Sequence, residues 1–201
     1  MSSARLVQVI LGSTRQGRAG ERVARWFLNQ ATGREDLELE LVDLRDWPLP
    51  FFDSPFPPMM GRYEDPAQQA WAAHVARADA YVIVTPEYNH GYPAVLKNAL
   101  DTLFAEWRGK PVGFVGYGGS GGGIRAVEQL RQVVIELDMH PLRDSVALPR
   151  VYAAFDEDGR LREPSHARAA AAVLDGVASF RTGNTTWESA PRSPSAANHT
   201  P

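Results

Sequence analysis

The sequence predicts an α/β protein built on a doubly wound, five-stranded parallel sheet with helices on both faces. Two observations lead to this fold class: strand and helix patterns alternate about five times along the chain, and most strand segments are continuous apolar runs. Strands that alternate with helices form parallel sheets, because each crossover places a helix on a face of the sheet. Right-handed crossovers and a count of five strands favour the order 2-1-3-4-5 over a six-stranded dinucleotide-binding sheet.

Strands are predicted where short apolar runs end at polar or turn-forming residues. The clearest run, 80–84, lies between Asp79 and Pro86. In 37–42, leucine alternates with glutamate, and this period of two indicates a half-exposed strand near the edge of the sheet. The predicted strands are 5–11, 37–42, 80–84, 111–115 and 144–148.

Helices are predicted where apolar residues recur every three or four positions. The pattern is strongest in 124–137, where Ile124, Val127, Leu130 and Val134 share one face. The predicted helices are 21–30, 67–76, 94–104, 124–137 and 168–180.

The 201 residues suit a single domain, which we expect over residues 1–181. Residues 182–201 are rich in Ser, Thr, Pro, Asn and Ala, a composition that predicts a disordered tail. The segment 44–65 contains five prolines together with Trp47, Phe51, Phe52 and Phe56. Long loops of this kind in compact domains are usually functional, but these aromatic residues could equally serve only to fasten the loop to the core.

Composition excludes several functional classes. The chain has no cysteine, so disulfides, thiolate metal sites and cysteine nucleophiles are absent and redox chemistry requires a bound cofactor. The net charge of −3 argues against nucleic acid or an anionic membrane as a partner. The first apolar run, 6–11, is too short for a membrane span and lacks signal-peptide features, so we expect a cytoplasmic protein.

Three unusual loops follow the first, third and fourth strands, whose carboxyl ends form the ligand-binding edge of a doubly wound sheet. The first loop, 12–20, combines glycines, the hydroxyl groups of Ser13 and Thr14, and the cations Arg15 and Arg18 ahead of a helix N-terminus. These are the parts of an anion site, so a phosphate is the expected occupant. The loop lacks the lysine and hydroxyl residue of a P-loop, which argues against NTP hydrolysis.

The second and third loops suit a flat ring. Residues 85–93 mix turn formers with aromatic and amide groups, and six of the eight residues in 116–123 are glycine, which lets backbone approach a ligand closely. The second loop contains one Glu-x-x-His pair, too little for a metal site. The third loop also contains Gly118-x-Ser120-x-Gly122, a nucleophile-elbow pattern, so an alternative is a serine hydrolase. Its acid and base would come from Asp138, Asp144, His140 or His166.

With these loops in view, the sequence resembles the NADPH-dependent FMN reductases, flavodoxin-like proteins that include quinone reductases and azoreductases. The resemblance spans most of residues 7–148. Its specific pieces are Gly-Ser-Thr-Arg at 12–15, Thr-Pro-Glu-Tyr-Asn-His-Gly at 85–91 with Pro93 and Leu-Lys-Asn-Ala-Leu-Asp at 96–101, and Gly-Tyr-Gly-Gly-Ser at 116–120.

The resemblance implies a bound FMN and the residues that hold it. The phosphate would be held by the first loop, and the ring by the second and third loops. The implied cofactor residues are Ser13, Thr14, Arg15, Gly17, Arg18, Ala19, Gly20, Pro86, Glu87, Tyr88, Asn89, Gly118, Gly119 and Ser120. Many relatives carry Ser or Asn in the second half of the first loop, so Arg18 either replaces a neutral donor or points to solvent.

The resemblance further implies hydride transfer from NADPH or NADH through FMN to a small acceptor such as a quinone or free flavin. The flavin would perform the chemistry, so no catalytic side chain is assigned. The family also implies a homodimer or tetramer with FMN near the interface, the contact helix lying within residues 94–107. A flavin-binding electron carrier or redox sensor without rapid turnover is the alternative from another class.

Overall fold

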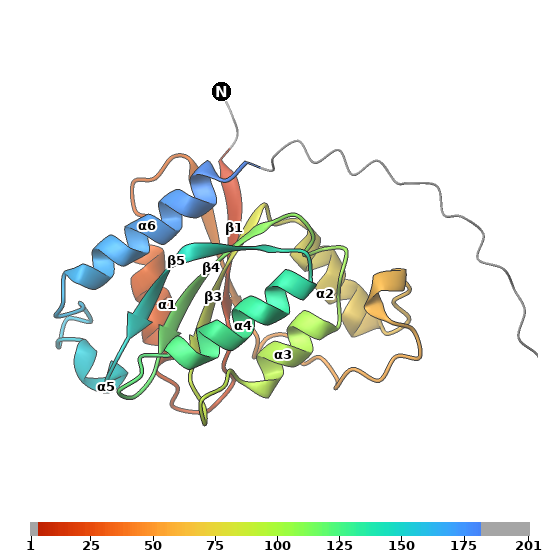
Figure 1. Cartoon of the computed structure of the whole chain (residues 1–201), viewed down its shortest axis with the longest axis horizontal. Coiled ribbons are helices and arrows are strands. Elements are labelled where there is room, and N and C mark those ends of the chain that lie inside the picture. The colour runs from red at the N-terminus through yellow and green to blue at the C-terminus, as the bar shows by residue number, and fades with distance from the viewer. Residues whose placement is uncertain (1–3, 182–201) are drawn as a thin grey trace, which may run out of the picture.

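The computed structural model describes residues 4–181, and its sheet confirms the predicted topology (Figure 1). Five strands pair in parallel in the order β2-β1-β3-β4-β5. Their bounds are β1 Arg5–Leu11, β2 Leu37–Asp43, β3 Ala80–Pro86, β4 Pro111–Tyr117 and β5 His140–Leu148. The expected tail, 182–201, lies outside the described residues.

The helices cover the two faces of this sheet, and each face has its own core (Figure 1). On one face, Phe27 of α1 and Val173 of α6 pack against β1, β3 and β4. On the other, Trp71 of α2, Leu96 of α3 and Leu130 of α4 are buried against the sheet. The bounds are α1 Gly20–Asn29, α2 Pro66–Ala76, α3 Ala94–Asp101, α4 Ile124–Glu136, α5 Val151–Ala154 and α6 Ser165–Ser179, with a 3₁₀ turn, η1, at Pro58–Met60.

Apart from shifts of one to three residues at other ends of helices and strands, three features differ from the prediction. Strand β5 begins at His140, because Pro111 of β4 already pairs with it, although residues 140–145 of this edge strand are polar or half-exposed and show no apolar run. Helix α3 ends at Asp101, and the chain to Trp107 continues in turns. Helix α5 has four residues, too few for a helical period, and was not predicted.

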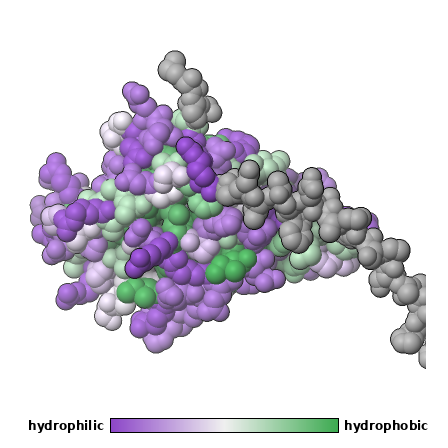
Figure 2. Space-filling model, turned by 45° about the horizontal axis from the view of Figure 1, so that its top comes forward, coloured by the Kyte–Doolittle hydropathy of each residue, from purple (hydrophilic) through white to green (hydrophobic). Residues whose placement is uncertain are grey.

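The segment 44–65 is fastened to the core at Trp47, as one of the two interpretations expects, and a functional role for the segment stays a prediction. Trp47 fastens it to the core, since its ring lies 5.0 Å from that of Trp71 and 4.6 Å from that of His74. Farther along, Phe51 is 80% exposed and Met59 67% exposed. The molecular face drawn in Figure 2 is mainly hydrophilic, with separate apolar patches. Across residues 4–181, no helix has the length and apolar character to cross a membrane.

Candidate cofactor site

The carboxyl ends of the strands enclose a cavity of about 440 Å³ at the edge of the sheet where the predicted loops meet. Arg15, Arg18 and Ala19 contribute from the first loop, residues 86–88 from the second and residues 117–119 from the third. Residues 150–153, around the start of α5, form a further wall that the sequence did not predict. The cavity thus lies where the three loops predicted from the sequence meet the segment 150–153.

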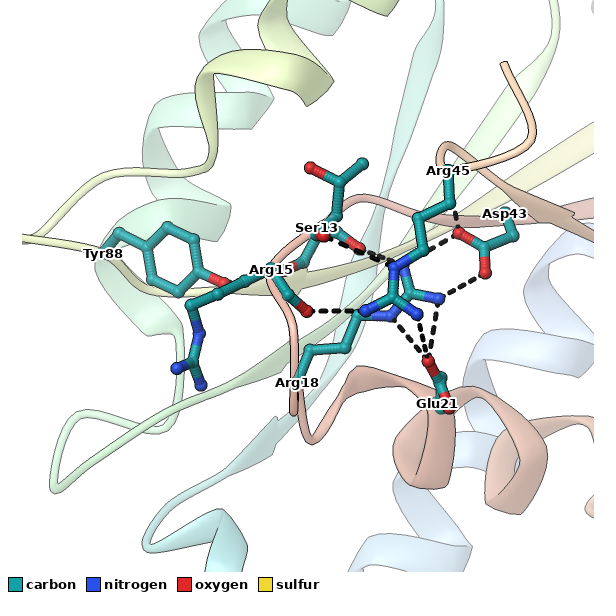
Figure 3. A network of polar contacts seen from close by, with 8 residues as sticks. Ser13, Arg15, Arg18, Glu21, Asp43, Arg45 and Tyr88 are labelled. Atoms are coloured by element: carbon teal, nitrogen blue, oxygen red, sulfur yellow. Dashed lines mark hydrogen bonds and ion pairs between the residues drawn. The ribbon is translucent and has the colours of Figure 1, made fainter. Parts of the chain in front are cut away.

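The first loop is held by two arginines that bind its carbonyl groups (Figure 3). Arg18 donates to the carbonyl of Ser13, while Arg45 donates to those of Thr14 and Arg15 at 3.3 and 2.8 Å. Because the C=O and N–H of a peptide unit point in opposite directions, the amides that follow these carbonyls face away from the arginines. Within residues 4–181, no amide of residues 13–19 donates a hydrogen bond, so the loop presents free N–H donors of the kind that bind anions.

Arg18 is directed at carboxylates. Its side chain is 2% exposed and lies between Asp43, at the end of β2, and Glu21 of α1, with Nη1 2.8 Å from the Asp43 Oδ1. Burial raises the pKa of Asp43, but the hydrogen bonds and positive charges of Arg18 and Arg45 together outweigh it, and the net shift is downward. Arg18 therefore neither replaces a neutral donor nor points to solvent: it supports the loop from behind.

Arg15 stands at the rim of the cavity. Its Nη2 donates to the Tyr152 hydroxyl at 2.9 Å, and in the described part of the chain it forms no ion pair with a carboxylate. Hydrogen bonds involving Tyr88 and Tyr152 raise the pKa of Arg15 further. A cation without a carboxylate partner beside free amides completes an anion-binding loop.

The second loop forms a tight hairpin. The N–H and C=O groups of Tyr88 and Gly91 bond reciprocally at 2.8 and 2.9 Å, and Asn89 and His90 between them have φ values of 49° and 69°. Two successive positive φ values define a type I′ turn. The turn holds Tyr88 so that its hydroxyl lies 2.7 Å from the Ser13 Oγ, which connects the second loop to the first.

This turn leads to a stability prediction. His90→Val is expected to lower the free energy of unfolding by about 1 kcal/mol or more, because a β-branched residue in the left-handed region is strained. His90→Asn is the matched control, since asparagine adopts this conformation readily. Urea denaturation measures both variants. Equal stability of the valine and asparagine variants would contradict the assigned turn.

Glu87 connects the second loop to the third. Its carboxylate accepts hydrogen bonds from the backbone N–H and the Nε of Arg125, at 3.2 and 2.6 Å, at the start of α4. Its own N–H donates to the carbonyl of Tyr117 at 3.0 Å. The Glu87 side chain thus fixes the spacing between the two loops, and only its backbone carbonyl and Cβ remain for a flat ligand.

The third loop closes on itself through Gly123, which has a φ of 87°. A Cβ at this position would lie 2.6 Å from the backbone of Gly116. The Gly118 amide already donates to the carbonyl of Leu148 at 3.2 Å, whereas those of Gly119 and Ser120 have no acceptor among residues 4–181. Of the three amides expected to face a ring, two are therefore free.

The structure does not support the serine hydrolase alternative. Ser120 lies at the carboxyl end of β4, but His140 begins β5 at the opposite edge of the sheet, paired with Pro111. His140 instead packs against the ring of Phe180 at 5.0 Å. No hydrogen bond in the described chain links Ser120 to His166. The glycine-rich run matched the elbow pattern by composition alone.

Comparison with known proteins identifies the family. Residues 6–153 match the family described as NADPH-dependent FMN reductase, a segment that contains all three loops and the wall at residues 150–153. The chain belongs to the NADPH-dependent FMN reductase family. An NAD(P)H-dependent FMN reductase of Schizosaccharomyces pombe is 43% identical over 148 residues, which cover 72% of this chain and 74% of the relative.

Other relatives of the chain carry the name quinone reductase. A quinone reductase of Pseudomonas putida is 31% identical over 174 residues, covering 81% of this chain and 88% of the relative. Among solved structures, the flavoenzyme NAD(P)H:(acceptor) oxidoreductase FerB of Paracoccus denitrificans superposes with a TM-score of 0.71 at 22% identity, over 87% of this chain and 96% of that one. A flavodoxin from Streptococcus pneumoniae superposes with a TM-score of 0.55, which confirms the flavodoxin-like fold.

Proposed function

We propose that this protein is an FMN-dependent oxidoreductase that passes hydride from NADPH or NADH to a small acceptor such as a quinone or free flavin. The observation that carries the proposal is the first loop, where unpaired amides and Arg15 surround one side of a cavity at the ligand-binding edge of the sheet. The names of its relatives, FMN reductases and quinone reductases, support the same chemistry.

The residues present fit FMN. The phosphate would be held by the side chains of Ser13, Thr14 and Arg15 and by the backbone amides of the first loop, including those of Gly17, Ala19 and Gly20. Arg18 would act indirectly, because its bond to the Ser13 carbonyl keeps these amides turned toward the phosphate. Residues 86–89 and 118–120 would line the ring. Glu87 would contribute backbone there, because its carboxylate is occupied by Arg125.

Bound FMN supplies the atom that accepts and donates hydride, so the protein needs no side-chain acid or base. The free amides of Gly119 and Ser120 would stabilise negative charge that develops on a ring held beside them. The ion pair between Glu87 and Arg125 would keep those amides at a fixed distance from the second loop.

The proposal includes a cytoplasmic homodimer or tetramer. Asn98 of α3 bonds the carbonyl of Pro50 and the amide of Phe52, so the exposed apolar part of segment 44–65 is fastened beside the expected contact helix. Covering Phe51 and Met59 with a second copy would remove exposed apolar surface from water. Light scattering tests this, and the mass of a single 22.1 kDa chain in solution contradicts it.

Steady-state kinetics distinguish the enzyme from an electron carrier. Initial rates are measured at several concentrations of NADPH and a quinone, without oxygen. We expect repeated turnover and parallel double-reciprocal lines, since both substrates would use the same ring face in turn. A protein that is reduced once by NADPH but does not turn over with any quinone, azo or flavin acceptor is a carrier or sensor.

A further inference from the structure

Tyr117, the last residue of β4, places at the cofactor site a hydroxyl group that forms no hydrogen bond with any residue of the described chain. The residue is only 4% exposed, yet its Oη has no hydrogen-bond partner among residues 4–181. Buried hydroxyl groups are almost always paired, because an unpaired one loses its hydrogen bonds to water without replacement. The two other unpaired buried side-chain atoms belong to Gln8 of β1 and His74 of α2, and neither residue lines the cavity.

The hydroxyl points at the first turn of α1. A Cβ added to Gly20 would overlap the Tyr117 Oη, so the phenol occupies the space that this glycine leaves open. Leu11 closes the same space, 2.7 Å from that Cβ position. The Oη therefore lies at the end of the loop whose amides are free, rather than beside the ring-binding loops.

Tyr117 is suited to donate a hydrogen bond to an anion. Burial raises the pKa of Tyr117 well above that of a free phenol, although the nearby Ser13 hydroxyl acts in the opposite direction. The phenol is therefore neutral at physiological pH, with one O–H to give. No residue among 4–181 accepts a hydrogen bond from the Tyr117 Oη, so this donor is available to a bound ligand.

We propose that Tyr117 donates a hydrogen bond to a phosphomonoester oxygen of the bound flavin nucleotide, and so makes the site select the phosphorylated flavin over riboflavin. The geometry supports a phosphate over a ring contact because the Oη faces Gly20 and Ser13, next to the free amides and the positive end of α1. This inference rests on the proposed function. It adds Tyr117 to the cofactor residues that the family resemblance implies.

The test compares flavins in wild type, Tyr117→Phe and the control Tyr81→Phe. Tyr81 is also buried, but its hydroxyl donates to the Val75 carbonyl at 2.9 Å at the far edge of the sheet. Dissociation constants for FMN and riboflavin are measured by quenching of flavin fluorescence, and the thermal unfolding of each apoprotein is recorded.

We expect Tyr117→Phe to bind FMN about tenfold more weakly or worse, as for loss of a hydrogen bond to a charged group, and riboflavin as wild type does. Its apoprotein should unfold at the wild-type temperature or above, because an unpaired hydroxyl has been removed. Tyr81→Phe should keep the wild-type ratio of the two affinities. Unchanged FMN affinity in Tyr117→Phe, or an equal loss for both flavins, overturns the inference alone. A wild type that binds neither flavin overturns the proposed function as well.

Discussion

Replacing Asp43 by alanine should lower the free energy of unfolding by about 3 kcal/mol, at the low end for a buried ion pair because Asp43 is partly exposed. The loss leaves the Arg18 guanidinium buried with only Glu21 and a carbonyl as partners. The first loop depends on that guanidinium, so affinity for FMN should fall in the same variant.

Urea denaturation and FMN titration measure the two effects of Asp43→Ala. Asp46→Ala is the control, since it removes a nearby carboxylate that forms no ion pair in residues 4–181. An Asp43→Ala protein that keeps wild-type stability and FMN affinity would contradict the role assigned to Arg18.

The pH dependence of stability gives a second check on the same pair. The pKa of Asp43 is lower in the folded protein than in the unfolded chain, so its contribution is complete above the unfolded pKa of about 4 and disappears as the pH falls through the lower folded value. The stability difference between wild type and Asp43→Asn should therefore shrink below about pH 4. A difference that stays constant with falling pH contradicts the assignment.

Replacing Arg15 by alanine should weaken FMN binding by about 10- to 100-fold, the range for a hydrogen bond to a charged group. Arg15 has no carboxylate partner in the described chain, and its guanidinium lies at the rim of the cavity beside the free amides. Riboflavin affinity should change little, because the contact is with the phosphate.

The control for Arg15→Ala is Arg25→Ala, which makes the same change in net charge on α1 outside the first loop. Fluorescence titration of both variants separates the local contact from long-range attraction. Equal FMN affinity in wild type and Arg15→Ala would move the phosphate away from the first loop.

Local pattern was sufficient for most of the fold. The strand at 5–11 was predicted to the residue, and the topology followed from alternation and handedness, because each helix and strand carries its own period. Strand β5 and helix α5 were harder: an edge strand with polar residues and a four-residue helix have no such period.

The candidate site could likewise be predicted only in part. Glycines and arginines in one loop pointed to the anion site, but Asp43 and Arg45 support that loop from elsewhere in the chain, and such tertiary pairings leave no local pattern. Since the sequence does not show that Asp43 pairs with Arg18, it predicts Arg18 to be either a phosphate ligand or a solvent-exposed residue. Tyr117 did carry a signal: it is a polar ring at the end of an apolar strand, directly before the glycine run.

The most direct test is the visible absorption spectrum of the purified protein, supplied with FMN and recorded before and after addition of NADPH without oxygen. The account predicts a protein-bound flavin spectrum that bleaches on addition of NADPH and returns when a quinone is added. A protein that takes up no FMN, or that binds FMN but is bleached by neither NADPH nor NADH, would contradict it.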